Sequence, residues 1–323
     1  MRAGMSLSVA AGVAAGLASR YVRGREAADR ATMAEMESRV SDLGAVERVS
    51  VLPLVEREVA IAGLRGETGV SYLVRADELR ILFDLGLGTG RSRTVLETNV
   101  DVLGRSVHDV DVVVISHLHP DHVGGFGYQL RSSFGVGRNL ALPRGVAAFV
   151  PTEMSHPHAH VCQVEQARVI GSGVAVMPPL PRMMFWGGPI AEQALVINVR
   201  GRGLVVLTGC GHPAIERTLA AVERIVQMPV YAVVGGLHLP VHAWGTALIP
   251  AATVGTPNWP WQPVSESQAR STIEAIRARG PGLVALSTHD STPWTINSFK
   301  QVFGERYRTL RVGEETIIAA PST

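Results

Sequence analysis

The stretch Ser116-His117-Leu118-His119-Pro120-Asp121-His122 decides the fold, because it follows the apolar run 112–115 and precedes two glycines. Side chains alternate along a strand, so His117 and His119 can converge on one ion. The turn that follows brings Asp121 and His122 towards a second ion. Imidazoles with a carboxylate suit zinc, iron or manganese. The alternative interpretation is a polar loop whose histidines cap the start of a helix.

Residues 116–125 resemble the signature of the metallo-β-lactamase-fold hydrolases, in which an HxHxDH motif supplies the ligands of one or two metals. The resemblance implies that His117, His119, Asp121 and His122 are metal ligands in this chain.

Short β-branched runs and amphipathic segments predict the architecture. The strand-like runs are residues 49–54, 70–74, 81–83, 112–115, 147–150, 174–176, 194–199, 204–207, 230–234, 283–286, 310–312 and 316–319, and the helical ones are 214–226, 265–278 and 294–303. Two strand-rich halves with helices outside them predict an α+β protein built as an αββα sandwich, two mixed β-sheets flanked by helices. The resemblance implies the same fold.

A dinuclear site needs further ligands, which are expected at later strand ends. Two stretches, 204–213 and 283–290, each run from an apolar strand into polar residues. The Thr-Gly-Cys-Gly-His-Pro run at 208–213 and the Gly-Gly-Leu-His-Leu run at 235–239 look like the dihydropterin ribofuranosylaminobenzene phosphate synthase-like branch of the superfamily. That branch commonly has His-Cys-Thr-Gly where this chain has His-Asp-Ser-Thr at 289–292.

The resemblance extends the ligand set to later residues. It implies His212 and His289 as metal ligands, and it puts Cys210 where many relatives have an aspartate that bridges both metals. A thiolate at Cys210 could bridge in the same way, or the residue could be a small buried side chain. His238 is predicted as a catalytic residue that contacts the substrate, with a supporting hydrogen-bond role as the alternative.

Other residues receive supporting or structural interpretations. Asp84 matches an aspartate that relatives bury beneath the metals, and Glu192 matches an acidic residue for which a structural hydrogen bond is expected. Metal binding by His156, His158 and His160 is weighed against a surface loop, which the nearby Pro157 favours. His108 and His242 are expected to be loop histidines. Trp259 and Trp261 either contact substrate or pin the long loop 244–263.

The composition excludes some functions. The 323 residues are 46% hydrophobic, and the charge of +2, from 30 basic and 28 acidic residues, does not indicate a nucleic-acid surface.

Residues 3–19 carry no charge, and arginines follow them at positions 20, 23 and 25. Residues 1–45 are therefore interpreted as a membrane anchor with a helical linker, ahead of a catalytic domain at 46–323. A disordered segment and a cleaved signal are the alternatives.

The predicted function is metal-assisted hydrolysis of a small-molecule ester, lactone or phosphoester. Two divalent ions, zinc before iron or manganese, would activate water, and Asp121 would hold a metal and orient the nucleophile. One alternative is the transferase reaction of the dihydropterin-like branch, for which Arg144 and Arg182 are candidate anion-binding residues. The other is a non-catalytic metal or ligand sensor. The expected location is the cytoplasmic side of a membrane, or otherwise the cytoplasm.

Overall fold

The computed structural model describes residues 2–35, 39–242, 253 and 255–322. Two seven-stranded sheets and a two-stranded hairpin make up its β-structure. The strands of the first sheet, in spatial order, are β16 (Thr316–Ala319), β1 (Arg48–Val55), β2 (Ser71–Ala76), β3 (Leu79–Phe83), β4 (Val112–Val114), β5 (Val146–Val150) and β6 (Ala159–Gln163). The strands from β16 to β3 pair antiparallel, and those from β3 to β6 pair parallel, so this sheet is mixed.

The second sheet is also mixed. Its order is β15 (Tyr307–Thr309), β14 (Leu283–Leu286), β13 (Val230–Gly235), β12 (Gly203–Thr208), β11 (Leu195–Val199), β8 (Val174–Val176) and β7 (Arg168–Gly171). The strands from β15 to β12 are parallel and the others antiparallel. The separate hairpin consists of β9 (Leu180–Met184) and β10 (Gly188–Glu192).

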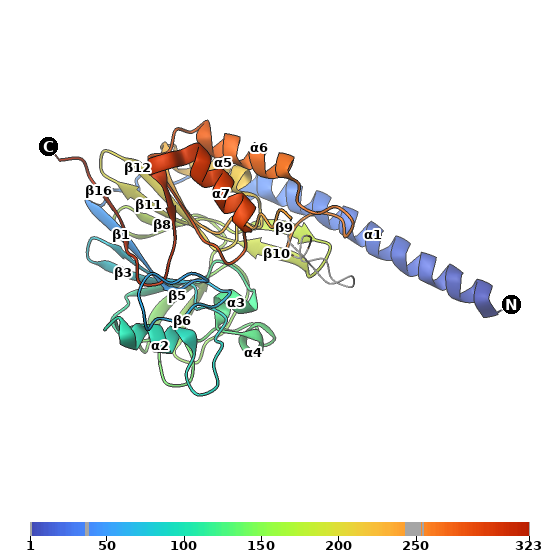
Figure 1. Cartoon of the computed structure of the whole chain (residues 1–323), viewed down its shortest axis with the longest axis horizontal. Coiled ribbons are helices and arrows are strands. Elements are labelled where there is room, and N and C mark those ends of the chain that lie inside the picture. Colours follow the sequence, from blue (N-terminus) through green and yellow to red (C-terminus); the bar gives the residue numbers. More distant parts are fainter. Residues whose placement is uncertain (1, 36–38, 243–252, 254, 323) are drawn as a thin grey trace.

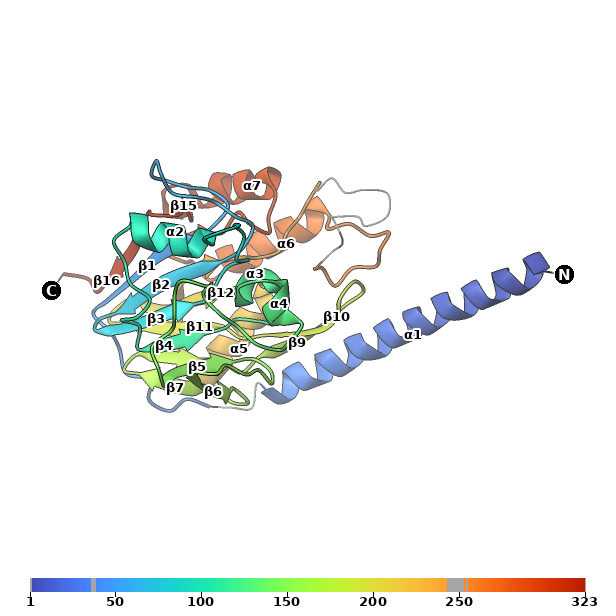
Figure 2. The same cartoon turned by 90° about the horizontal axis from the view of Figure 1, so that it is seen from below.

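Helices cover the outer faces of both sheets, as Figure 1 shows. The covering helices are α2 (Val95–Val102), α3 (Pro120–Val123), α4 (Phe126–Gln129), α5 (Ile215–Val226), α6 (Glu266–Arg277) and α7 (Pro293–Phe303), with a 3₁₀ turn at Gly304–Arg306. A further helix, α1 (Arg2–Glu35), contacts the hairpin instead. One apolar core lies between the sheets, a second joins the second sheet to α5, α6 and α7, and a third joins the first sheet to α2. Figure 2 shows α2, α3 and α4 on the outer side of the first sheet. The predicted αββα sandwich is confirmed.

Three local predictions are corrected. Residues 310–312 are not a strand, because the backbone N–H of Leu310 donates to Leu286 whereas that of Val312 donates to Glu58, so neighbouring bonds go to different partners. The edge strands β6 and β7 are half-exposed and lack the apolar run by which a buried strand is predicted. The prolines of the stretch 178–181 predict an irregular loop, but β9 already begins at Leu180, because an edge strand tolerates proline.

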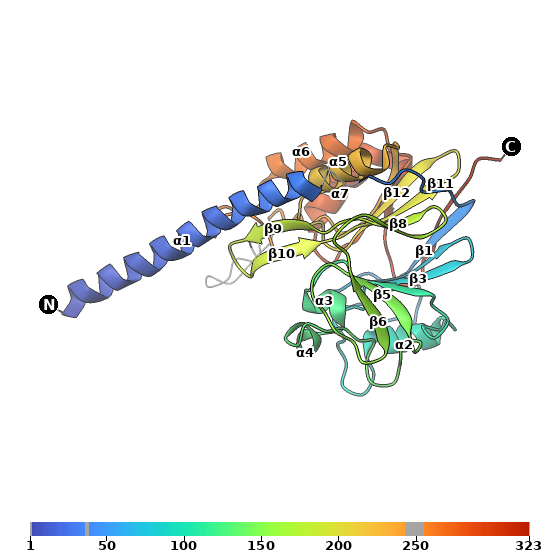
Figure 3. The same cartoon turned by 180° about the vertical axis from the view of Figure 1, so that it is seen from behind.

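The N-terminal helix α1 packs along the β9 hairpin, as Figure 3 shows. Tyr21 and Ala28 are buried in this contact. Gly24 permits the close approach, because a Cβ there would lie 2.8 Å from the side chain of Met183. Residues 3–19, interpreted from the sequence as the apolar part of an anchor, belong to this helix. No helix in the described part of the chain is both long and apolar enough to cross a membrane.

Candidate metal centre

The HxHxDH stretch leads from an irregular segment after β4, which ends at Val114, into the short helix α3. Pro120 opens α3, where its fixed φ and missing N–H suit the first turn, and Gly124 ends it with a φ of 92°. His119 therefore lies on extended backbone, with φ −107° and ψ 155°, while Asp121 and His122 lie on a helical turn. His119 precedes the helix but its side chain makes no capping hydrogen bond. The alternative in which these histidines merely cap a helix is wrong.

Three imidazoles meet at a first group of ring nitrogens. Nδ1 of His119 lies 3.1 Å from Nε2 of His117 and 3.1 Å from Nε2 of His212. His212 comes from the turn between β12 and α5, so the first and second sheets both contribute to the group. Four ligands around zinc at about 2.0 Å stand about 3.3 Å apart in a tetrahedron. The observed separations match that geometry.

In His117 and His212, the hydrogen bond made by the ring nitrogen that points away from the group determines which nitrogen carries the proton. Nδ1 of His212 lies 2.8 Å from the carbonyl oxygen of Gly255, which only accepts, so this nitrogen carries the hydrogen. Oγ of Ser116 donates to Asp84 at 2.6 Å and therefore accepts from Nδ1 of His117 at 2.9 Å. Nε2 of both histidines is consequently bare, and the two lone pairs face the same point. A cation at that point satisfies them.

A second group lies beside the first and contains Asp121, His122, Cys210 and His289. Sγ of Cys210 lies 3.1 Å from Nε2 of His122 and 3.2 Å from Nε2 of His289. Oδ2 of Asp121 lies 3.5 Å from Nε2 of His122 and 4.0 Å from Nε2 of His289. Cys210 also belongs to a cluster with His212 and His238, so it lies between the two histidine groups.

Asp84 orients His122, a member of the second group, by a hydrogen bond to its ring. It follows β3 with a φ of 57°, and its carboxylate accepts from the N–H of Ser116 at 2.7 Å. Its Oδ2 also lies 2.7 Å from Nδ1 of His122, so Nε2 of that ring is left to face Cys210. A carboxylate behind a histidine in this way fixes the tautomer and raises its basicity as a ligand.

Glu192 organises the turn that carries Cys210 and His212. This buried carboxylate at the end of β10 accepts four backbone N–H groups at 2.8–3.0 Å, those of Gly209, Cys210, Gly211 and His212. Gly209 cannot carry a side chain, since a Cβ there would lie 2.1 Å from Oγ of Ser116. The structural hydrogen-bonding role expected of Glu192 is confirmed.

Burial alone would lower the pKa of His122, but Cys210, Asp121 and Asp84 raise it well above its ordinary value. Burial favours the neutral, metal-binding form of the other four imidazoles. It lowers the pKa of His117, His212 and His289 well below the ordinary value, and that of His119 to about 4. Burial alone would raise the pKa of Asp121, but His122, His289 and His119 lower it well below its usual range. Burial raises the pKa of the Cys210 thiol, and a bound cation would reverse that shift.

His238 lies at the border between the histidine groups and a pocket. Its ring centroid is 4.7 Å from that of His212, and its backbone N–H donates to Asp290 at 2.9 Å. Both histidines line a pocket of about 300 Å³ together with Arg182. This arrangement is compatible with substrate contact by His238. Arg144, the other candidate anion-binding residue, is exposed on a loop and does not line this pocket.

Several histidines lie elsewhere. His156 stacks on Phe134 with a centroid distance of 4.8 Å, and neither it, His158 nor His160 joins a candidate metal group among the described residues. The surface-loop interpretation thus holds for His156 and His158, whereas His160 lies on the edge strand β6. His242 pairs with Glu266 at 2.9 Å, and both side chains are exposed.

The tryptophans and the glycine-rich loop have structural roles. The ring of Trp259 lies 4.7 Å from that of Tyr21 in α1 and stacks on Trp261, which favours pinning of the loop. Much of the 244–263 stretch lies outside the described residues. The Gly-Leu-Gly-Thr-Gly run at 86–90 lacks the GxGxxG spacing of a dinucleotide-binding loop. The backbone N–H groups of residues 87–89 instead donate to the carboxylate of Glu67, so they do not form a phosphate cradle.

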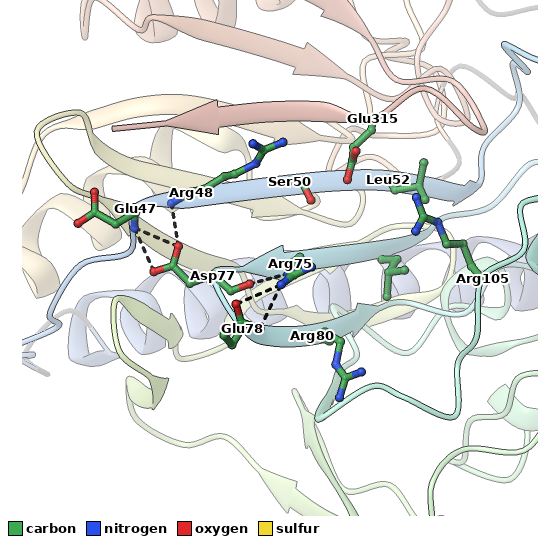
Figure 4. A pocket seen from close by; sticks show the side chains of 11 residues that line it. Glu47, Arg48, Ser50, Leu52, Arg75, Asp77, Glu78, Arg80, Arg105 and Glu315 are labelled. Atoms are coloured by element: carbon green, nitrogen blue, oxygen red, sulfur yellow. Dashed lines mark hydrogen bonds and ion pairs between the residues drawn. The ribbon is translucent and has the colours of Figure 1, made fainter. Parts of the chain in front are cut away.

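A larger cavity, about 660 Å³, lies on the exposed face of β1, β2 and β3 and contains none of the candidate ligands. Figure 4 shows that charged side chains line it, and several of these charges are satisfied locally. Asp77 accepts the backbone N–H groups of Glu47 and Arg48, and Arg75 pairs with Glu78 at 3.1 Å. Because no candidate metal ligand lines this surface groove, we assign it no part in the metal centre.

Three supporting groups were not predicted from the sequence. Ser116 begins the quoted motif and orients His117, and a hydroxyl immediately before the first histidine was the available signal. Ser287 lies two residues before His289, with its Oγ 2.5 Å from Nδ1 of that ring. No local sequence pattern predicts the contact between the carbonyl of Gly255 and His212, because the two residues are 43 positions apart.

Comparison with known proteins agrees with the fold. Residues 64–135 match the family model of the metallo-beta-lactamase superfamily. The whole fold is similar to Tm1679, a metal-dependent hydrolase of the beta-lactamase superfamily, with 20% identity and a TM-score of 0.58 over 84% of this chain and 99% of that one. It is also similar to the metallo-beta-lactamase fold protein YhfI from Bacillus subtilis, with 13% identity and a TM-score of 0.52 over 84% of this chain and 100% of that one.

The chain therefore has the metallo-β-lactamase fold, and its resemblance to the metallo-β-lactamase superfamily is confirmed. The members of that superfamily include metal-dependent hydrolases, and this chain has candidate His, Asp and Cys ligands for a divalent metal. The dihydropterin-like branch stays a prediction.

Proposed function

We propose that this protein is a metal-dependent hydrolase with a dinuclear centre, most simply of zinc. His117, His119 and His212 would hold one ion, and Asp121, His122 and His289 the other, with Cys210 between them. The observation that carries the proposal is the pair of bare Nε2 atoms on His117 and His212, each fixed by a hydrogen bond on the far side of its ring. When bound, such ions act as Lewis acids and activate water.

The chain's own residues then have distinct tasks. Asp121 is the least buried of the candidate ligands on the second group, with 23% of its side chain exposed, and it can orient a water between the groups. Asp84 and Glu192 hold the ligands rigidly. His238, half-buried at the edge of the pocket, can donate a hydrogen bond to a substrate oxygen or to the leaving group.

The proposed substrates are small molecules with an ester, lactone or phosphoester bond. Transfer chemistry of the dihydropterin-like type is the second candidate, and the observation favouring it is the arginine-lined pocket beside His212. A non-catalytic sensor is the third. A cytoplasmic location is proposed along with these functions.

The test is metal content with turnover. The full chain is reconstituted with zinc, iron or manganese, its metal content is measured by elemental analysis, and it is assayed on esters, lactones and phosphodiesters. We expect close to two ions per chain and turnover of one substrate class. His212→Ala and His289→Ala should each lose one ion and the turnover.

The matched control is His242→Ala, since His242 is exposed, pairs with Glu266, and contacts the ring of Trp294 rather than a candidate ligand. It should retain both ions and full activity. Absence of metal uptake by the wild-type chain would refute the metal centre. Full metal occupancy without turnover on any hydrolase substrate would point to the transferase or to the sensor.

A further inference from the structure

The pocket beside the metal centre is built from separate parts of the chain. It has a volume of about 300 Å³, and His212 and His238 form the wall shared with the candidate metal groups. Arg182 of β9 and residues from the starts of α5 and α6 form other walls. A molecule in this pocket would thus extend from the reacting centre towards Arg182.

Arg182 carries a charge that its surroundings neutralise only in part. Its side chain is 17% exposed, and its Nε is buried with no hydrogen-bond partner among the described residues. The nearest carboxylate, Asp29 of α1, lies 4.0 Å away from Arg182 but 2.7 Å from Arg217. Asp29 is therefore shared between two guanidinium groups, and Arg217 holds it more closely.

Other groups around Arg182 add positive rather than negative charge. Burial, Arg217 and Arg25 lower the pKa of Arg182, whereas Asp29 and Tyr21 raise it. Among the residues that line the pocket, Glu216 is the acidic one, and its carboxylate already accepts a hydrogen bond from Thr272 at 2.5 Å. The start of α5, which also lines the pocket, has no side-chain cap at Ala214. Its helix dipole therefore adds to the attraction for an anion.

We propose that Arg182 binds an anionic group of the substrate, a phosphate or a carboxylate, while the bond to be broken lies at the metal groups beside His212. This inference rests on the proposed function and specifies its substrate class. Arg182 is a specificity residue here, and it takes no part in the bond cleavage. A guanidinium suits the task because it offers several fixed donors to an oxyanion.

The N-terminal helix tunes this subsite. Asp29 of α1 competes for Arg182, and Tyr21 of α1 donates a hydrogen bond to the carbonyl of Pro257, which also lines the pocket. Substituting Asp29 should consequently strengthen anion binding, whereas substituting Arg182 should weaken it. These opposite signs separate a ligand-binding role from a general loss of structure.

The experiment measures binding of inorganic phosphate and of acetate to the full-length, zinc-reconstituted chain by calorimetry. The variants are Arg182→Met and Asp29→Asn, with Arg200→Met as an exposed control that pairs with Glu47 away from this pocket. Zinc content is measured for each protein. We expect Arg182→Met to weaken binding of the preferred anion about tenfold or more and Asp29→Asn to tighten it several-fold, with zinc content unchanged.

The comparison of phosphate with acetate identifies the anion. If wild type and Arg182→Met bind both anions equally, or if Asp29→Asn weakens binding, the inference is overturned. Its failure is distinguishable from failure of the proposed function. If only the anion-binding inference fails, zinc binding and hydrolysis of an uncharged ester persist. If the proposed function fails, zinc binding itself is absent. Should Arg182→Met fold poorly, Asp29→Asn alone still decides, since tighter binding cannot come from damage.

Discussion

Oδ2 of Asp84 lies 2.7 Å from Nδ1 of His122, and both side chains are completely buried. This contact turns the opposite nitrogen of His122 towards Cys210, so it links the first sheet to the second group of candidate ligands.

Asp84→Asn is expected to weaken metal binding by about 10 to 100-fold, because the amide no longer fixes the tautomer of His122 or raises its basicity. Competition with a metal-binding dye measures the change. Asp111→Asn is the matched control, since Asp111 is exposed and pairs with Arg80. Equal metal affinity in Asp84→Asn and wild type would contradict this role.

Glu192→Gln should destabilise the fold by about 2 to 4 kcal/mol, because four backbone N–H groups lose a charged acceptor and one of them would face an amide NH₂. Urea unfolding measures the free energy. The exposed Glu274, paired with Arg277, provides the control Glu274→Gln, which should differ little from wild type. A small effect at Glu192 would mean that the turn 209–212 holds itself without the carboxylate.

Cys210 is expected to bind metal as a thiolate. Its Sγ lies 3.1 and 3.2 Å from the facing nitrogens of His122 and His289, so a shared ion would contact all three and deprotonate the thiol. Cobalt(II)-loaded wild type should show a sulfur-to-cobalt charge-transfer band. Cys210→Ser should lose the band, and Cys162→Ser should keep it. A wild-type spectrum without the band would make Cys210 a small buried residue, the other interpretation of the sequence.

The sequence predicted the parts of the site that local patterns encode. Alternation along a strand predicted that His117 and His119 converge, and they do so although β4 ends at Val114 and both lie in the segment that follows it. Polar residues after apolar runs marked the strand ends that precede His212 and His289. These four residues do lie in the two candidate groups. The αββα sandwich followed from the same patterns, because buried strands of both sheets are continuous apolar runs.

Contacts between distant segments could not be predicted from those patterns. The carbonyl of Gly255 fixes the tautomer of His212, yet its loop has no periodicity that places it. Arg182 meets Asp29 only because α1 packs on β9, a contact set by the small residue Gly24 and by Tyr21. Such pairings depend on how the whole chain closes, and no short stretch of residues carries that information.

The last prediction concerns pH and the buried carboxyl of Glu56. Tyr72 donates a hydrogen bond to the Glu56 carboxylate at 2.6 Å. Burial raises the pKa of Glu56 from 4.5 to about 7, although hydrogen bonds from Ser287 and Tyr72 lower it. A raised pKa in the folded state means that the contribution of Glu56 to stability is fully present below about pH 4.5. It is lost as the pH rises through about 7, because the buried carboxylate is disfavoured.

Glu56→Gln stays neutral and escapes this loss. Relative to wild type, its free energy of unfolding should therefore rise by about 3 kcal/mol between about pH 4.5 and pH 8, since each unit of pKa shift corresponds to about 1.4 kcal/mol. Urea unfolding across this range measures the difference, with Glu58→Gln as a control at an exposed neighbour. A difference between Glu56→Gln and wild type that stays constant with pH would show that Glu56 titrates alike in the folded and unfolded chains.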